Sequence, residues 1–167
     1  MKVEMSFSGD LLEGLRQLES DMKEHVVRPA ARAGALVFYE EARRLVPVYS
    51  GTARTGIKPG QLRDAIYHVF SEDKSSELVK VYEISWNARK APHGYLIEYG
   101  HWRVNKLIQV NGRWMATSER LEKPVWVPGA AFIRRSYDQA QIAVAAMQKR
   151  AAERTAEVLA GHNGGGE

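Results

Sequence analysis

Apolar and polar residues follow two successive periods at the start of the chain. They alternate over residues 1–8, which is the period of a half-buried strand. After Gly9 the apolar residues fall three or four positions apart, at Leu11, Leu15, Leu18 and Met22. This spacing places them on one face of a helix that Asp10 is suited to cap. The pattern therefore predicts a strand followed by a helix.

A second helical stripe follows directly. Proline is tolerated in a first helical turn, so Pro29 favours a new helix starting near Val27 over one continuous rod. Pro47 ends this helix, because a proline disfavours helical backbone at the residue before it. Its apolar stripe is Ala31, Ala35, Phe38, Ala42 and Leu45.

Strand patterns dominate the middle of the chain. Residues 62–70 and 78–86 are rich in β-branched and aromatic side chains and are separated by a polar turn, which predicts an antiparallel pair. Residues 107–110 and 113–116 flank Asn111-Gly112. Both central positions of a type I′ turn need positive φ, so this dipeptide predicts a tight hairpin.

Between these two pairs lies a short helical turn. Tyr95, Leu96 and Tyr99 are spaced to share one side of it, and Gly100 is suited to end it in a left-handed conformation. We expect this turn to form an aromatic plug between the two strand-rich regions.

Glu98 is a carboxylate within that otherwise apolar turn. Since buried carboxylates are rare unless paired, we expect it either on the solvent side of the turn or paired with an arginine. A functional alternative makes it an acid or a metal ligand together with His93 and His101. The spacing of these three residues matches no recognised metal or acid–base motif.

The C-terminal third predicts a charged link over 118–123, an extended approach over 124–129 and a long helix. The helix carries an apolar stripe at Ile133, Tyr137, Ala140, Val144, Met147, Ala151 and Val158. Residues 161–167 are expected to form a flexible, glycine-rich tail. Residues 1–160 thus predict a single α+β domain, in which an antiparallel sheet of about four to five strands packs with two N-terminal helices and the long C-terminal helix. The pattern leaves open whether the last helix packs within its own subunit or on a neighbouring one.

Composition narrows the possible functions. The 167 residues are 44% hydrophobic and 26% charged, with a net charge of +4, so they suffice for a globular core and are only mildly basic. The absence of cysteine excludes disulfides, thiolate metal sites and cysteine nucleophiles, and suits folding in the cytosol. The apolar runs are too short to span a membrane, so we expect no membrane partner.

Motifs for catalysis are missing from the sequence. It has no Gly-x-Ser-x-Gly elbow, no phosphate-binding Gly-Lys-Ser/Thr loop and no His-Glu-x-x-His, and its five histidines have no regular ligand spacing. We therefore expect a protein that is not an enzyme and that has no catalytic, cofactor-binding or metal-binding residues.

The predicted hairpin gathers aromatic and basic side chains. They are Trp102, Trp114 and Trp126 with Arg103, Lys106 and Arg113. Stacking of bases on the tryptophans would make the chain a small basic nucleic-acid-binding protein. The alternative, an ordinary sheet core with a solvated basic face, is favoured because no known DNA- or RNA-binding motif is present.

Three segments of the chain carry a further pattern. Its positions are Pro47, Gly60, Leu62 and Arg63 in the first segment, Tyr95, Glu98 and Gly100 in the second, and Pro128 and Phe132 in the third. In this order the segments resemble a large family of siphophage neck and tail-completion (head–tail joining) proteins, many of which are described only as phage tail components. The chain departs from the family pattern in an insertion over 49–59, in His101 where threonine is usual, and in residues 129–131, which separate Pro128 from Phe132. The resemblance covers nearly the whole chain.

The resemblance implies a structural virion protein of a phage neck, assembled in the host cytoplasm. Copies would form a ring, with six or twelve as the candidate copy numbers, that completes the tail or joins head to tail around the DNA channel. Expected partners are the head-closure or connector protein and the tail-tube or tail-terminator protein, with genome DNA passing through without specific binding. Which ring layer the protein occupies stays open.

Two polar segments are the candidate assembly contacts. One is the loop 48–59, which is either a solvated insertion or a contact arm, and the other is the hairpin. Their candidate residues are Tyr49, Arg54, Lys58, Arg103, Lys106, Asn111 and Arg113.

Overall fold

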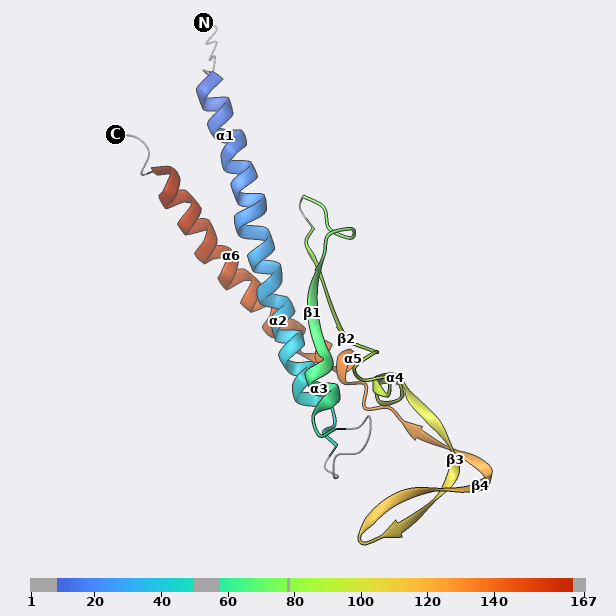
Figure 1. The fold of residues 1–167 in the computed structure, drawn as a ribbon. Helices are drawn as coiled ribbons and strands as arrows, with labels where there is room; N and C mark the ends of the chain where they lie inside the picture. The colour runs from blue at the N-terminus through green and yellow to red at the C-terminus, as the bar shows by residue number, and fades with distance from the viewer. Residues whose placement is uncertain (1–8, 50–57, 78, 164–167) are drawn as a thin grey trace, which may run out of the picture. The chain divides into compact units, whose positions relative to one another are not determined.

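The computed structural model describes residues 9–49, 58–77 and 79–163 (Figure 1). The chain mixes helices and strands, as predicted for an α+β fold. It divides into two compact units. Unit 1 comprises Met1–Glu41, His68–Ile84 and Tyr137–Glu167, and unit 2 comprises Ala42–Tyr67 and Ser85–Ser136. The predicted first strand, over residues 1–8, lies outside the described residues.

The N-terminal helices are continuous, so the predicted break near Val27 is wrong. Helix α1 (Gly9–Met22) passes through a π-helical turn, η1 (Lys23–Val27), into α2 (Arg28–Leu45), with helical backbone at both junctions. Pro29 has no N–H to donate to the His25 carbonyl four residues earlier. That carbonyl instead accepts a hydrogen bond of 2.9 Å from Arg154 Nε. A partner from the C-terminal helix thus replaces the bond that proline removes.

The C-terminal helix of unit 1 packs through alanines. A 3₁₀ turn, η2 (Tyr137–Gln139), leads into α6 (Ala140–Asn163), which lies beside the N-terminal helices (Figure 1). Ala143 is buried, whereas Val144 of the predicted stripe is exposed. The buried face of α6 is therefore rotated relative to the predicted apolar stripe.

Close approach of the two helices explains this rotation. A Cβ on Gly34 would lie 2.6 Å from Met147 Cγ and 3.4 Å from the Ala143 carbonyl oxygen, so the missing side chain at Gly34 makes room for Met147 and for the α6 backbone. Helix α6 also includes Gly161, which corrects the predicted start of the flexible tail. Residues 164–167 of that tail lie outside the described part of the chain.

The strands form two separate sheets rather than the single sheet of four to five strands that was predicted. Strand β1 (Ile66–Ser71) pairs with β2 (Val81–Trp86), and β3 (Gly100–Val110) pairs antiparallel with β4 (Arg113–Pro128). Strand β4 takes in the predicted charged link and extended approach, so β3 has a partner along its length. The hydrogen bonds that would have joined β3 to a larger sheet are made inside the hairpin.

Helix α3 (Gln61–Ala65) replaces the first residues of the predicted strand 62–70. Gly60 precedes it with φ of 75°, and Leu62 and Ala65, three residues apart, are both buried. Tertiary burial at helical spacing decides the conformation of this segment over its strand propensity.

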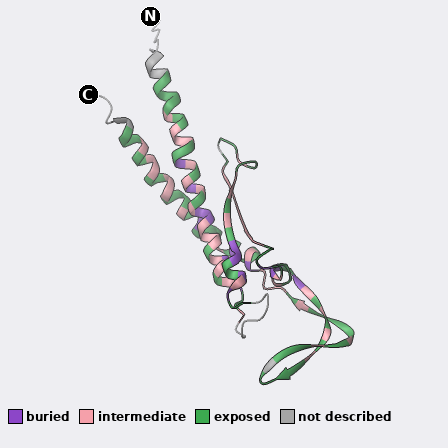
Figure 2. Cartoon of the chain, viewed as in Figure 1, coloured by how far each residue is buried: buried purple, intermediate pink, exposed green. Residues whose placement is uncertain are grey.

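Each unit has a small core, and most of the hairpin is exposed (Figure 2). Unit 1 buries Val26, Ala30, Ala35 and Ala143. Unit 2 buries Ala42, Val46, Leu62, Ala65, Ile66, Ala91 and Phe132. Such thin cores leave many large apolar side chains on the surface.

The predicted hairpin turn is confirmed. Asn111 and Gly112 have φ of 50° and 76°, and Val110 pairs with Arg113 across them. We expect Gly112→Val to weaken the hairpin locally by about 1–2 kcal/mol, because a β-branched residue resists positive φ. Gly112→Asn is the matched control, since asparagine tolerates that conformation. Amide exchange along β3 and β4 measures the effect, and equal protection in the two variants would contradict it.

Candidate assembly surface

Glu98 is the centre of unit 2. Its side chain is only 2% exposed and ends within reach of the start of helix α5 (Phe132–Ser136). Oε2 accepts a hydrogen bond of 3.0 Å from the Ile133 amide, and Oε1 accepts bonds from the Arg134 amide at 3.2 Å and from Arg134 Nε at 3.1 Å. The predicted arginine partner is confirmed, and the predicted position on the solvent side is wrong.

The main chain around Glu98 is held equally firmly. Its carbonyl accepts a 2.8 Å bond from an Arg134 terminal nitrogen and a 3.2 Å bond from the Ala131 amide. The carbonyl of Ile97 accepts a 2.7 Å bond from the Ala130 amide. These bonds satisfy the last carbonyls of α4 (Gly94–Tyr99) with donors from residues 130–134. The segment 129–131, where the chain departs from the family pattern, thus ties α4 to α5.

The predicted aromatic plug faces outward. Gly94 and Glu98, four residues apart, form the buried face of α4, while Tyr95, Leu96 and Tyr99 are exposed. A Cβ on Gly94 would lie 2.6 Å from Trp86 Cδ1, so only glycine lets the indole pack there. Gly100 ends this turn and has positive φ, 88°, as predicted, but its ψ of 174° is extended and not that of the predicted left-handed cap.

The other positions that carry the resemblance in unit 2 differ in their surroundings. Leu62 and Phe132 lie in the core, with the Phe132 ring 5.9 Å from that of Trp86. Pro128 pairs with Gly100 in the hairpin register. Arg63 is exposed, its Nε is 3.9 Å from Asp64, and its carbonyl accepts a hydrogen bond from Arg43.

A mainly apolar hollow of about 330 Å³ lies at the ends of the insertion. It is lined by Pro47, Val48, Tyr49, Lys58, Gly60, Gln61, Leu62, His93 and Ile97. The hollow brings together Pro47, Gly60 and Leu62 from the resemblance with two of the candidate contacts, Tyr49 and Lys58. Arg54 and the rest of the loop over 50–57 lie outside the described residues.

The candidate contacts of the hairpin differ in their surroundings. Arg103 is half-buried, and its Nε has no hydrogen-bond partner among the described residues. Lys106 pairs with Glu119 across the strands. Asn111 is exposed at the turn, and Arg113 begins β4, but the Arg113 side chain lies outside the described part.

The hairpin also exposes large apolar side chains, which the sequence pattern had favoured as sheet core. We call this set the hairpin surface. It comprises Trp102, Val104, Ile108, Val110, Trp114, Met115, Val125 and Trp126. Trp102 is 61% exposed and Trp126 47%, so the favoured interpretation of these side chains as core is wrong.

The two central tryptophans of the hairpin surface are paired. Trp102 lies opposite Trp126 in the register, and their rings meet edge to face at 5.3 Å. Register shifts between Arg103 and Leu107 then displace the strands, because β4 holds more residues than β3. The hairpin thus presents aromatic side chains on a sheet whose two strands bond only to each other in the described topology.

The structure also bears on the metal-site alternative. Among the described residues, no three His, Asp or Glu side chains lie close enough together to hold a metal ion. In the same part of the chain, no helix combines the length and apolar character that a membrane crossing requires.

Comparison with known proteins gives no relatives. No family model matches the chain, and neither a curated protein nor a solved structure matches it.

Proposed function

We propose that the chain is a structural subunit of a tailed-phage neck, whose copies assemble into a ring that completes the tail or joins head to tail around the DNA channel. The observation that carries this proposal is the hairpin surface. Eight large apolar residues are exposed on a single two-stranded sheet. Of these residues, Trp102 and Trp126 lie opposite each other with their rings in contact. Exposed apolar clusters are typical of protein interaction sites, and tryptophan is enriched among the residues that dominate binding.

The stability of the hairpin also favours a partner. An isolated two-stranded hairpin is marginally stable in water and gains stability when its apolar face is covered. Strands β3 and β4 extend over Gly100–Val110 and Arg113–Pro128, yet only Gly100 is fully buried among the residues of these strands whose burial is described. A second protein surface would cover what the chain itself leaves open.

The resemblance to neck and tail-completion proteins gains support from the arrangement of its motifs. Glu98 from the second segment binds the amides that follow Phe132 in the third. Residues matched separately in the sequence are therefore bonded to each other in unit 2, as expected for one structural node rather than for chance similarities.

In this proposal a neighbouring copy of the chain covers the hairpin surface. A closed ring needs a heterologous interface, in which each subunit presents two different surfaces. Connector and tail proteins would bind the faces of the ring, and DNA would pass through it without sequence-specific contacts. The protein would then act in the virion and have no catalytic role.

The test is the double substitution Trp102→Ala/Trp126→Ala. We expect it to lower the native mass of assemblies, measured by sedimentation with and without isolated tails, and to leave complemented phage particles defective in head–tail joining. The folding of unit 1 should be unchanged, because both residues lie in unit 2.

Ile142→Ala is the matched control, since Ile142 is a similarly exposed apolar residue on α6. Assemblies and infectivity equal to wild type in the tryptophan variant would overturn the assembly role of the hairpin. A defect confined to the Ile142 variant would instead identify the C-terminal helix as the contact between subunits.

A further inference from the structure

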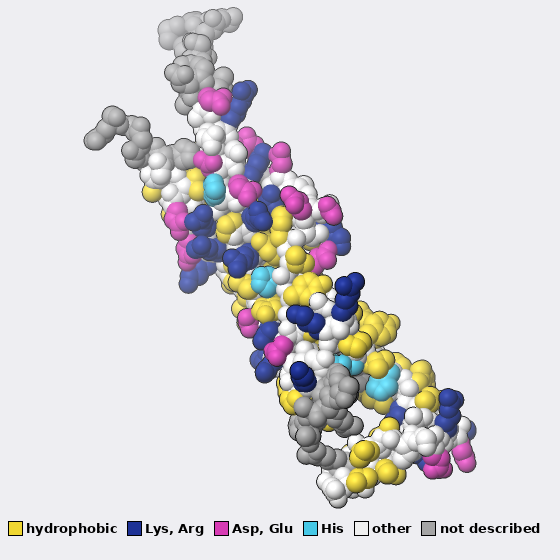
Figure 3. Space-filling view, in the orientation of Figure 1, with side chains coloured by type: hydrophobic (Ala, Val, Ile, Leu, Met, Phe, Trp, Pro, Cys, Tyr) yellow, Lys and Arg dark blue, Asp and Glu magenta, His cyan; other side chains and the backbone are white. Residues whose placement is uncertain are grey.

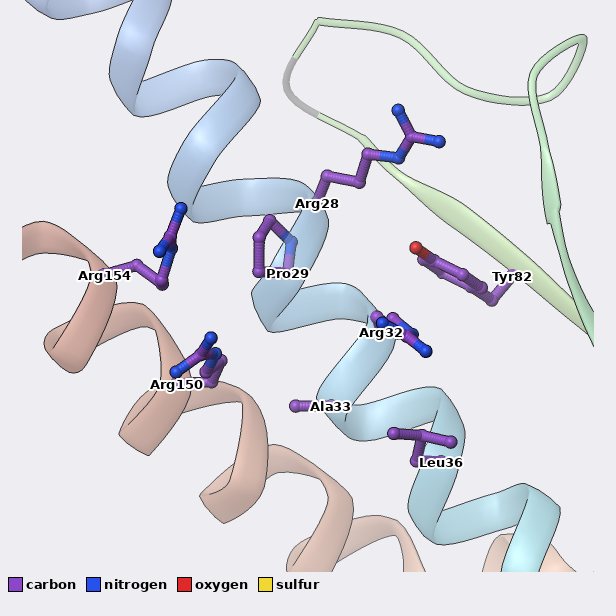
Figure 4. Close-up of a pocket in the computed structure, with 8 residues that line it drawn as sticks. All are labelled: Arg28, Pro29, Arg32, Ala33, Leu36, Tyr82, Arg150 and Arg154. Atoms are coloured by element: carbon purple, nitrogen blue, oxygen red, sulfur yellow. The ribbon is translucent and has the colours of Figure 1, made fainter. Parts of the chain in front are cut away.

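Unit 1 carries a hollow of about 560 Å³ that the proposed function does not use. It is lined by Arg28, Pro29, Arg32, Ala33, Leu36, Tyr82, Arg150 and Arg154. We call it the arginine hollow. Four of the eight lining residues are arginines and none is acidic. Figure 4 shows two arginines on each of helices α2 and α6, beside the apolar residues Pro29, Ala33 and Leu36.

Two of the arginines, Arg28 and Arg154, are held in place by neighbouring groups. The Arg28 guanidinium lies 4.3 Å over the Phe70 ring and 3.3 Å from Glu24. Its hydrogen bond with Tyr82 raises the pKa of Arg28 above its ordinary value. Arg154 pairs with Glu157 while its Nε binds the His25 carbonyl. These contacts order Arg28 and Arg154 before any ligand arrives.

The positive charge of the arginine hollow is not fully balanced. Arg150 pairs with Glu153 at 3.0 Å, so three of the four arginines have a glutamate partner. Arg32 is exposed and has no hydrogen-bond or ion-pair partner in the part of the chain that the structure describes. Basic and acidic side chains are interspersed over the helices of this unit (Figure 3).

We propose that the arginine hollow binds phosphate groups of a nucleic-acid strand. Guanidinium groups form paired hydrogen bonds with phosphate oxygens, which lysine does not, and all the lining cations are arginines. The pairs Arg28/Arg32 and Arg150/Arg154 are each separated by one helical turn, or about 6 Å along the axis. A repeated pair of cations suits a ligand whose anionic groups also repeat.

The glutamates do not block such a ligand. Exposed ion pairs contribute only about 0–1 kcal/mol, so a phosphate competes with them at little cost. Each guanidinium also has five donor hydrogens and can keep its glutamate while it binds a phosphate. The apolar residues between the arginines offer a surface for a sugar or a base.

This inference is independent of the proposed ring, because it rests on other residues. Phosphate contacts carry no sequence information, so the binding would be non-specific. It also differs from stacking of bases on the hairpin, which would use Trp102 and Trp126.

The experiment measures anisotropy of a labelled 25-nucleotide DNA strand, and of its duplex, titrated with the full chain at about 50 and 200 mM salt. We expect Arg32→Ala/Arg150→Ala to bind both at least tenfold more weakly than wild type. The slope of log affinity against log salt should shrink by about 1.8 for duplex and about 1.4 for single strand, as expected for two lost phosphate contacts.

The matched control is Arg16→Ala/Arg89→Ala, which removes the same charge from exposed positions outside the hollow and should change affinity less than threefold. Arg32→Lys/Arg150→Lys keeps the charge and should recover only part of the affinity. Competition with inorganic phosphate and with a nucleoside triphosphate distinguishes a site for a free anion from a site for a strand. Only for a strand should the affinity depend on the length of the ligand.

Several results would overturn the inference. They are the absence of wild-type binding at about 50 mM salt, equal losses in the hollow and control variants, and loss of binding in Trp102→Ala/Trp126→Ala instead. Normal DNA binding by the hollow variant together with failed assembly would assign the hollow to an acidic protein partner. None of these results would alter the sedimentation test of the hairpin.

Discussion

Replacing Glu98 by alanine is expected to destabilise unit 2 by about 3 kcal/mol. The substitution removes three hydrogen bonds to the carboxylate and leaves the Ile133 and Arg134 amides without their acceptor. Arg134 is 58% exposed, so its guanidinium regains water and the loss should stay below that of a fully buried pair. Denaturant titration followed by tryptophan fluorescence gives the measurement, because all four tryptophans lie in unit 2.

Two controls separate this effect from a general loss of charge. Glu98→Gln keeps the shape and one acceptor oxygen, so it should fall between wild type and alanine. Glu122→Ala removes an exposed carboxylate of the hairpin and should change stability by less than about 0.5 kcal/mol. An unchanged midpoint in Glu98→Ala would show that the node does not hold α4 and α5 together.

The features that the sequence predicted well are set locally. The turn at Asn111-Gly112 and the positive φ of Gly100 depend on backbone freedom that neighbouring residues do not alter. The arginine partner of Glu98 was also expected, because burial of a carboxylate requires one. Its identity was not, since Arg134 lies 36 residues further along the chain.

The predictions that failed depend on contacts between distant segments. A turn as short as α4 has two faces, and only the donors from Ile133 and Arg134 decide that Glu98 points inward while the tyrosines point out. The same holds for α6, where Gly34 makes room for the Met147 side chain while Ala143 is buried and Val144 is exposed. The period of the apolar residues shows that a helix has an apolar face, but it does not determine which residues of that face point toward the neighbouring segment.

The hairpin and the arginine hollow show a further limit of pattern analysis. Alternating apolar residues in a strand look the same whether they meet the core of their own chain or the surface of another. The sequence pattern therefore favoured core positions for Trp102 and Trp126, and only their exposure in the structure shows that they lie on the surface. Arginines four residues apart were present in both helices, but their meeting depends on how α2 and α6 pack.

Gly129→Ala is expected to be as damaging as the loss of the Glu98 carboxylate, at about 3 kcal/mol. A Cβ at this position would lie 2.6 Å from the Gly100 nitrogen and 2.7 Å from the Tyr99 carbonyl carbon, which are backbone atoms that cannot rotate away. Relief of the overlap requires residues 129–131 to move from α4, which would break the bonds from the Ala130 and Ala131 amides.

Gly14→Ala provides the matched control for this substitution. A Cβ on Gly14 would meet no atom within 4 Å, and alanine favours the helix by up to about 1 kcal/mol, so α1 should be unharmed or stabilised. Tryptophan fluorescence follows unit 2 in the Gly129 variant, and helical ellipticity follows the Gly14 variant. Equal stability of Gly129→Ala and wild type would mean that unit 2 does not need the close approach of Gly129 to Gly100. It would also mean that the bonds between α4 and residues 130–131 contribute little to the stability of unit 2.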